Sequence, residues 1–196
     1  MKIGVWMAGA ALIVIWTAAP AGADPHYSVE FYADAAMSSC ALDAHNAGIV
    51  DVHIFHTGEG SSTGLLFSAY PPACWPNVVW LDDHLAQPWA NIGSTQVPLG
   101  LSIGYGACLP LPIYVGYVRF MAPGNTESCC SFPVTHPTSW TYFTEPSIAV
   151  DCDFNEWPGT GRGVMVNANA SCGCGTDRSA LAVQETTWGA VKALYR

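Results

Sequence analysis

Hydrophobic and polar residues alternate in short segments along most of the chain. In the first segment, Tyr27, Val29 and Phe31 are separated by Ser28 and Glu30. A period of two places successive side chains on opposite faces, so each segment predicts a β-strand. About nine segments show such a strand pattern between Pro, Gly, Asn or Asp residues, and they cover 27–32, 50–54, 65–70, 78–81, 99–105, 113–121, 139–144, 148–152 and 163–167.

The order of these segments predicts an all-β fold. No helical segment separates them, which favours an antiparallel, immunoglobulin-like two-sheet sandwich over a parallel α/β sheet, with a β-barrel as the alternative. The turn residues at 58–61 predict a hairpin between the second and third segments. The chain contains 19 Gly, 14 Pro and only 11% charged residues, a composition typical of a turn-rich β-protein.

Only the end of the sequence has a helical pattern. After a linker from residue 177, a threonine at 186–187 can cap a short helix in which Trp188, Val191 and Tyr195 share one face. A helix of about ten residues is marginal alone, so we expect it either to dock on the sandwich or to order when something binds it.

The first 23 residues have the pattern of a secretory signal peptide. Lys2 precedes an apolar stretch over 3–16, which is too short for a membrane span of about 20 residues, and 21–23 read Ala-Gly-Ala, a signal-peptidase site. Cleavage there makes Asp24 the first mature residue. The chain is therefore expected outside the cytoplasm, either secreted, at the cell surface or in the periplasm, with no membrane span after cleavage.

The rest of the sequence predicts one acidic domain. We divide it into a disulfide-stapled sandwich over 24–176 and the linker and helix over 177–196, a length that can bury its own core. The mature chain has five Lys and Arg against fifteen Asp and Glu, so its formal net charge is near −10. Such a charge repels phosphate backbones and anionic lipids, so nucleic acid is not an expected partner.

All eight cysteines follow the cleavage site, which predicts four disulfides in an oxidising compartment. Sequence alone leaves the pairing open. A bridge between the neighbours Cys129 and Cys130 would strain the peptide between them, so different partners are expected, and the same holds for Cys172 and Cys174. A metal–thiolate cluster is the alternative, although the usual two-residue gap between zinc ligands is absent. The eight are Cys40, Cys74, Cys108, Cys129, Cys130, Cys152, Cys172 and Cys174.

Four features together resemble a group of uncharacterised secreted bacterial proteins. They are the signal peptide, an opening strand that ends in the acidic residue Asp34 and is followed by Cys40, the Cys-x-Cys pair near the end, and a closing Thr-Thr-Trp-Gly-Ala-Val-Lys-Ala-Leu-Tyr-Arg over 186–196. The group shares a Trp-Gly-x-Val/Ile-Lys-x-Leu-Tyr-Arg tail. The resemblance implies export by a Gram-negative-type bacterium and implies no activity, and the tail could be a docking helix, an interaction tag or a sorting remnant.

One motif could belong to a hydrolase. The stretch 60–64 reads Gly-Ser-Ser-Thr-Gly, the Gly-x-Ser-x-Gly pattern that makes Ser62 a candidate nucleophile, with His84 or His136 as a possible base. That motif requires a strand-to-helix turn in an α/β fold, whereas here it joins two predicted strands. A loop between strands is therefore the favoured interpretation.

Acidic residues offer a first kind of metal site. Oxygen ligands for Ca²⁺ recur at Asp151, Asp153, Asn155 and Glu156, but an EF-hand loop would need Gly where Glu156 stands, so a site here would be irregular. Asp82 and Asp83 form a weaker candidate of the same kind.

Histidines offer a second kind of metal site. Asp51 and His53 share one face of a predicted strand, while His56 points to the other face. Two ligands do not make a site, so no cofactor is assigned.

Tryptophans provide the best-motivated binding hypothesis. Trp75 and Trp157 lie beside prolines and turns, and Trp140 lies in a predicted strand, where exposed rings could stack on the sugars of a polysaccharide. The competing interpretation is that these rings fill the core and cover disulfides.

Three function classes remain, in order of preference. The first is a non-enzymatic extracellular or cell-surface module that is structural or binds another surface protein. The second is a carbohydrate-binding module that uses exposed tryptophans, and the third is a secreted hydrolase.

Overall fold

The computed structural model describes residues 26–140 and 144–172. These residues form twelve β-strands, and none of them lies in a helix. The strands are β1 Tyr27–Tyr32, β2 Ala41–Leu42, β3 Ala47–Gly58, β4 Ser61–Phe67, β5 Val79–Leu85, β6 Ala90–Gly93, β7 Leu101–Pro110, β8 Ile113–Pro123, β9 Cys130–Phe132, β10 Ser147–Val150, β11 Glu156–Arg162 and β12 Val164–Val166.

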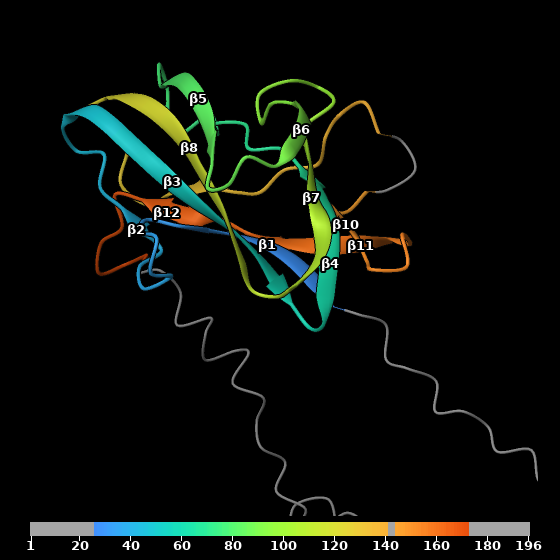
Figure 1. Cartoon of the computed structure of the whole chain (residues 1–196). Helices are drawn as coiled ribbons and strands as arrows, with labels where there is room; N and C mark the ends of the chain where they lie inside the picture. The colour runs from blue at the N-terminus through green and yellow to red at the C-terminus, as the bar shows by residue number, and fades with distance from the viewer. Residues whose placement is uncertain (1–25, 141–143, 173–196) are drawn as a thin grey trace, which may run out of the picture.

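Two sheets contain all of these strands (Figure 1). The large sheet has nine strands in the order β5-β8-β3-β1-β11-β10-β4-β7-β6, and the small sheet has the order β2-β12-β9. β10 and β11 pair as an antiparallel hairpin in the middle of the large sheet. This hairpin joins a half that contains β5, β8, β3 and β1 to a half that contains β4, β7 and β6.

The large sheet folds over so that its two halves face each other. Phe31 on β1 contacts Phe67 on β4 with ring centroids 6.2 Å apart, although β11 and β10 separate these strands within the sheet. His56 on β3 and Tyr105 on β7, which are further apart in strand order, join through His56 Nδ1 and the Tyr105 hydroxyl at 2.9 Å. The fold is therefore an all-β sandwich, and its core lies between the two halves.

An aromatic cluster fills the interior beside the small sheet. The Trp75 ring lies 5.4 Å from the Phe120 ring on β8 and 5.6 Å from the Phe132 ring on β9, and all three side chains are buried. The Cys74–Cys130 disulfide ties this loop to β9. Large rings give the most apolar burial per residue, so this cluster is a main source of stability.

Alternation located most strands correctly. The segment 27–32 is β1, and the segments at 50–54, 65–70, 78–81, 99–105, 113–121, 148–152 and 163–167 each overlap a strand. The predicted strand at 139–144 is wrong in its described part, because Ser139 lies in a turn and Trp140 is irregular. Alternation did not predict four strands, because they are short or rich in Gly and Pro. These are β2, β6, β9 and β11.

The predicted pairing needs two corrections. β3 and β4 do not form a hairpin, because β3 pairs with β1 and β8 while β4 pairs with β10 and β7. The turn at 58–61 thus carries the chain from one layer to the other. The sandwich is also not purely antiparallel, since β1 pairs with β11 and β2 with β12 in parallel. Pairing between distant segments is set by packing and leaves no local signature.

Three disulfides join described residues: Cys74–Cys130, Cys108–Cys152 and Cys129–Cys172. The adjacent cysteines at 129 and 130 have different partners, as their geometry predicted. Cys172 is also not bridged to Cys174, and Cys40 is disulfide-bonded. Disulfides thus staple the fold, as the cysteine count predicted.

Several predictions fall outside the described residues. They are the signal peptide at 1–23, the linker and helix at 177–196, and Cys174. In the part of the chain that the structure describes, no helix is long and apolar enough to cross a membrane.

Candidate functional site

β4 and β7 separate from each other halfway along their length. Ser62 stands opposite Leu109 and Gly64 opposite Gly104, so Thr63 alone spans the stretch that residues 105–108 cover on β7. Extra residues on one strand interrupt the ladder and bend that strand away. The sheet therefore opens at this point.

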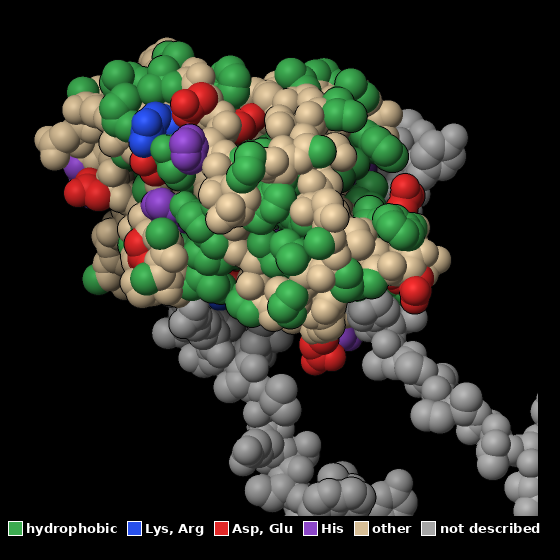
Figure 2. Space-filling view, viewed as in Figure 1, with side chains coloured by type: hydrophobic (Ala, Val, Ile, Leu, Met, Phe, Trp, Pro, Cys, Tyr) green, Lys and Arg blue, Asp and Glu red, His purple; other side chains and the backbone are tan. Residues whose placement is uncertain are grey.

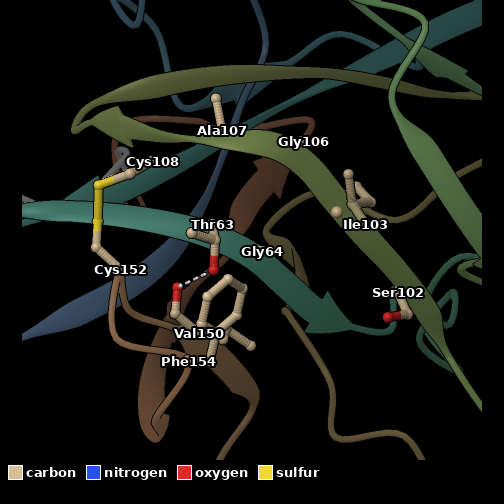
Figure 3. A pocket seen from close by; sticks show the side chains of 11 residues that line it. Thr63, Gly64, Ser102, Ile103, Gly106, Ala107, Cys108, Val150, Cys152 and Phe154 are labelled. Carbon is tan, nitrogen blue, oxygen red and sulfur yellow. Dashed lines mark hydrogen bonds between the residues drawn. A yellow bond between two sulfur atoms is a disulfide. The ribbon is translucent and has the colours of Figure 1, made fainter.

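A cavity of about 540 Å³ lies at this opening, within the size range of small-molecule sites. We call it the β4–β7 pocket (Figure 3). None of its lining residues is charged. They are Thr63, Gly64, Ser102, Ile103, Gly104, Gly106, Ala107, Cys108, Val150, Cys152 and Phe154.

Glycines form the floor of the pocket. Gly64 and Gly104 face each other across the two strands, in a row that continues through Val150 on β10. A Cβ atom on Gly64 would lie 2.8 Å from the carbonyl oxygen of Ile103, so no larger residue fits there without a shift. A Cβ atom on Gly104 would meet nothing within 4 Å. The space above Gly104 is therefore open, and only the absence of side chains keeps it open.

Phe154 forms the rim of the pocket. Its side chain is 78% exposed, and its φ of 64° places it in the left-handed region at the tip of the loop between β10 and β11. Figure 3 shows its ring beside Thr63 and Val150, below the β4 ribbon. An exposed phenyl ring at the mouth of an uncharged cavity offers apolar contact to a ligand.

Asp151 fixes the loop that carries Phe154. Its Oδ1 accepts hydrogen bonds from the backbone N–H groups of Asp153 and Asn155 at 2.9 and 2.8 Å. Its Oδ2 accepts from Trp157 Nε1 at 2.8 Å and from Asn155 Nδ2 at 3.0 Å. These donors, the Trp157 indole first, lower the pKa of Asp151 to about 2. The Cys108–Cys152 disulfide also ties the loop to β7.

Asp151, the first of the proposed calcium ligands, is bonded within its own loop. Both carboxylate oxygens of Asp151 accept hydrogen bonds from protein donors, as expected of a carboxylate that closes a loop. Among the described residues, no group of three or more His, Cys, Asp or Glu side chains could hold a metal ion. Asp153, Asn155 and Glu156 are exposed around the loop. The acidic loop thus positions Phe154 next to the pocket.

A smaller cavity adjoins the pocket and shares Ser102, Ile103 and Val150 with it. Its volume is about 90 Å³, and Trp140 and Glu156 are among its other lining residues. Of the three tryptophans proposed from the sequence, Trp140 is the one that borders a cavity in this face.

The tryptophan hypothesis needs a correction. Trp75 is 1% exposed and packs in the core, so it cannot be a platform for sugar rings. Trp157 is half-buried, and its indole N–H is bonded to Asp151. The structure therefore separates Trp75 from the other two candidates and does not place three rings on one surface.

The hydrolase motif is part of the sheet. Ser62 lies on β4 with no exposed surface, and its hydroxyl lies 2.7 Å from the Val150 carbonyl oxygen. His84 stacks on Tyr117, and His136 contacts the carbonyl oxygens of Glu145 and Trp140. Neither histidine is bonded to Ser62, so neither is placed to act as its base.

The opposite half of the sheet has a filled outer face over β5, β8 and β3. Tyr117 on β8 stands opposite His84 on β5 and His53 on β3. The Tyr117 and His84 rings stack at 4.6 Å, and Arg119 Cζ lies 4.8 Å from the centre of the Tyr117 ring. These contacts form a continuous ladder of side chains across three strands.

The second row of this face is an ion pair. Arg119 donates two hydrogen bonds to Asp51, at 2.8 and 2.9 Å. Asp51 and His53 share a face, as the alternation predicted, but the ring nitrogen Nδ1 of His53 bonds to the Tyr114 hydroxyl at 2.8 Å. Burial lowers the pKa of His53. These histidine and carboxylate groups are thus engaged with protein partners.

Figure 2 shows both halves of the sheet from one side. Basic, histidine and acidic side chains gather over β3, β5 and β8, whereas the surface over β4 and β7 is mostly hydrophobic and uncharged. Sequence reasoning missed this second region. The available signals were the Gly-Tyr-Gly at 104–106, which leaves outward positions of a strand bare, and a phenylalanine inside an acidic loop.

No protein-family model and no curated protein matches the sequence. The chain is similar to solved cohesin structures. A non-cellulosomal cohesin from Archaeoglobus fulgidus has 11% identity and a TM-score of 0.45, covering 81% of this chain and 99% of that one. A type II cohesin domain from the cellulosome of Acetivibrio cellulolyticus has 15% identity and a TM-score of 0.46, covering 73% and 96%. At these scores, no function or site residue is carried over.

Proposed function

We propose that this protein is an extracellular, non-enzymatic binding module and that its ligand site is the β4–β7 pocket. One observation carries the proposal: a cavity of about 540 Å³ without a charged side chain opens in the sheet below the exposed Phe154 ring. Ligand pockets are typically concave, largely apolar and preformed. It offers more free space for a ligand than the adjoining cavity of about 90 Å³.

The polar groups of the pocket favour binding over catalysis. Thr63 Oγ1 lies 2.9 Å from the Asp151 carbonyl oxygen, so it is already bonded, and Ser102 is the other hydroxyl in the lining. No acid, base or cation lines the cavity. Such a site can hold a ligand by apolar contact and orient it by one hydroxyl, but it has no group that moves a proton.

The pocket is held in shape by covalent and hydrogen-bonded supports. The Cys108–Cys152 disulfide joins its two walls, and Asp151 closes the loop below Phe154. A preformed site loses less conformational entropy when the ligand binds. The ligand best suited to it is an apolar group of small-molecule size. Carbohydrate is the second candidate, favoured by Trp140 in the adjoining cavity.

The test is chemical-shift mapping with 3-phenyl-1-propanol on the ¹⁵N-labelled full chain. We expect the amide signals of Gly64, Gly104 and Phe154 to shift with the probe and to saturate. Gly104→Leu should weaken binding at least about tenfold, because its side chain fills the open space above the floor.

Gly48→Leu is the matched control, since a Cβ atom there also meets nothing within 4 Å and Gly48 lies outside the pocket lining. Binding that is absent from the pocket residues, or unchanged in Gly104→Leu, would overturn the proposal. Shifts at Trp140 with an oligosaccharide, in place of the alcohol, would favour the second candidate.

A further inference from the structure

We infer that the β4–β7 pocket selects small organic cations, in which an apolar body carries an ammonium or related group. This inference rests on the proposed function of the pocket and adds the charge of its ligand. It follows from the charges around the pocket, because the lining itself is neutral.

The described part of the chain is strongly acidic. It contains twelve Asp and Glu residues but only two basic residues, Arg119 and Arg162. Arg119 is bonded to Asp51, and Arg162 lies 3.9 Å from Glu30. Both cations are therefore paired with carboxylates, and neither of those carboxylates lies in the loop that carries Phe154.

Two carboxylates flank the pocket rim. Asp153 precedes Phe154 in the loop, and Glu156 begins β11. Both are exposed, and within residues 26–140 and 144–172 neither side chain has a hydrogen bond or an ion pair. Arg162 is six residues along β11 from Glu156, which is about 20 Å in a strand. No side chain of the described residues therefore competes with a ligand for these two charges.

Strand register places Glu156 at the end of the row that forms the pocket floor. Glu156 stands opposite Val150, Val150 opposite Gly64, and Gly64 opposite Gly104. Neighbouring strands are about 4.8 Å apart, so the Glu156 backbone lies about 10 Å from that of Gly64. A ligand whose apolar body lies over Gly64 and Gly104 can thus reach Glu156 with a cationic group three or four bonds away.

Phe154 adds a second attraction for a cation. Its ring is 78% exposed, and ring faces attract ammonium groups through the quadrupole of the π-system. The same ring contacts an apolar body equally well. The rim therefore binds a ligand with an apolar body and a cationic group more tightly than one with either alone. An anionic group in the same place is repelled by Asp151, Asp153 and Glu156.

Three probes of nearly equal shape separate charge from apolar contact. They are 3-phenylpropylammonium, 3-phenyl-1-propanol and 3-phenylpropanoate, each titrated into the ¹⁵N-labelled full chain at pH 7 and low salt. We expect the ammonium to bind about tenfold more tightly than the propanoate, with the alcohol between them. Adding 0.5 M NaCl should reduce the differences in affinity between the three probes, since salt screens exposed charges.

A double variant, Asp153→Asn with Glu156→Gln, should remove most of the preference and leave the affinity of the alcohol unchanged. The matched control is Asp43→Asn with Glu127→Gln, which makes the same change in net charge in loops beside β2 and β9. The control should keep the full preference, because the effect depends on local charge.

The outcomes distinguish this inference from the function on which it rests. If all three probes shift the pocket signals with equal affinity, charge selection is wrong and apolar binding stands. If the double variant and its control lose the preference equally, selection comes from the overall net charge, and the inference is also overturned. If no probe shifts the pocket signals, the proposed function itself fails.

Discussion

The two outer faces of the large sheet differ in how their side chains use the same pleated backbone. Over β5, β8 and β3, outward positions hold large residues that contact one another, such as the stacked Tyr117 and His84 and the Arg119–Asp51 pair. Over β4 and β7, outward positions hold Gly64, Gly104 and Gly106, and the ladder is interrupted. One face is filled by its own residues, and the other leaves space for something else.

This difference separates two uses of a sheet surface. Cross-strand pairs on the filled face stabilise the strands that carry them. Glycines in the hollow face contribute no side-chain packing and lose more backbone entropy on folding. That face therefore contributes less to the free energy of unfolding and leaves an open site. Stability and binding therefore depend on different faces, and the following predictions test that separation.

The largest expected effect concerns the link between the two halves. Burial lowers the pKa of His56 to about 4, from an ordinary value of 6.5. The unfolded chain therefore takes up the proton first, so this part of the stability is complete above pH 6.5 and lost as the pH falls toward 4. Urea unfolding should show a loss of about 3 kcal/mol between pH 7 and pH 4.

His56→Gln should lack this part of the pH dependence, while His84→Gln, on the exposed ring of the filled face, should keep it. If His56→Gln retained the whole loss, the proton would bind elsewhere. The His56–Tyr105 bond would then not be what senses acid between the two halves.

A smaller effect is expected on the filled face. Tyr117→Ala removes the stacking on His84 and the contact with Arg119. We expect the free energy of unfolding to fall by about 1–2 kcal/mol. Binding of 3-phenyl-1-propanol at the β4–β7 pocket should stay the same, as judged by chemical-shift titration. A loss of binding in this variant would show that the two faces are not independent.

The smallest effect concerns the pocket rim. Asp151→Asn weakens the hydrogen bonds that hold the Phe154 loop. NMR order parameters at Phe154 should therefore fall, and the affinity for the uncharged 3-phenyl-1-propanol should drop by less than about threefold. In the wild-type chain the pKa of Asp151 is about 2, so the loop should keep its order above pH 4 and lose it as the pH falls toward 2.

Asp153→Asn is the control for charge, because the Asp153 side chain accepts no hydrogen bond from the described residues. An equal loss of order in both variants would mean that charge, and not hydrogen bonding, fixes the rim. The hollow face would then be shaped by electrostatics more than by its loop.

The sequence by itself determined features that depend on near neighbours in the chain. Alternation located β1 and β8, because a strand's period is a local property. Adjacency separated the partners of Cys129 and Cys130, because a bridge between neighbours is strained. The acidic loop at 151–156 is also visible in the sequence, as one candidate site for Ca²⁺.

Only the tertiary structure decided which segments meet. A turn has the same kind of sequence whether the two strands it joins pair with each other or lie in different layers. Residues 58–61 therefore could not show that β3 and β4 lie in different layers. Trp75 and Trp157 both lie beside prolines, yet one is buried against Phe120 and the other bonds to Asp151. The pocket itself arises where β7 bulges away from β4, and such a gap belongs to two strands at once.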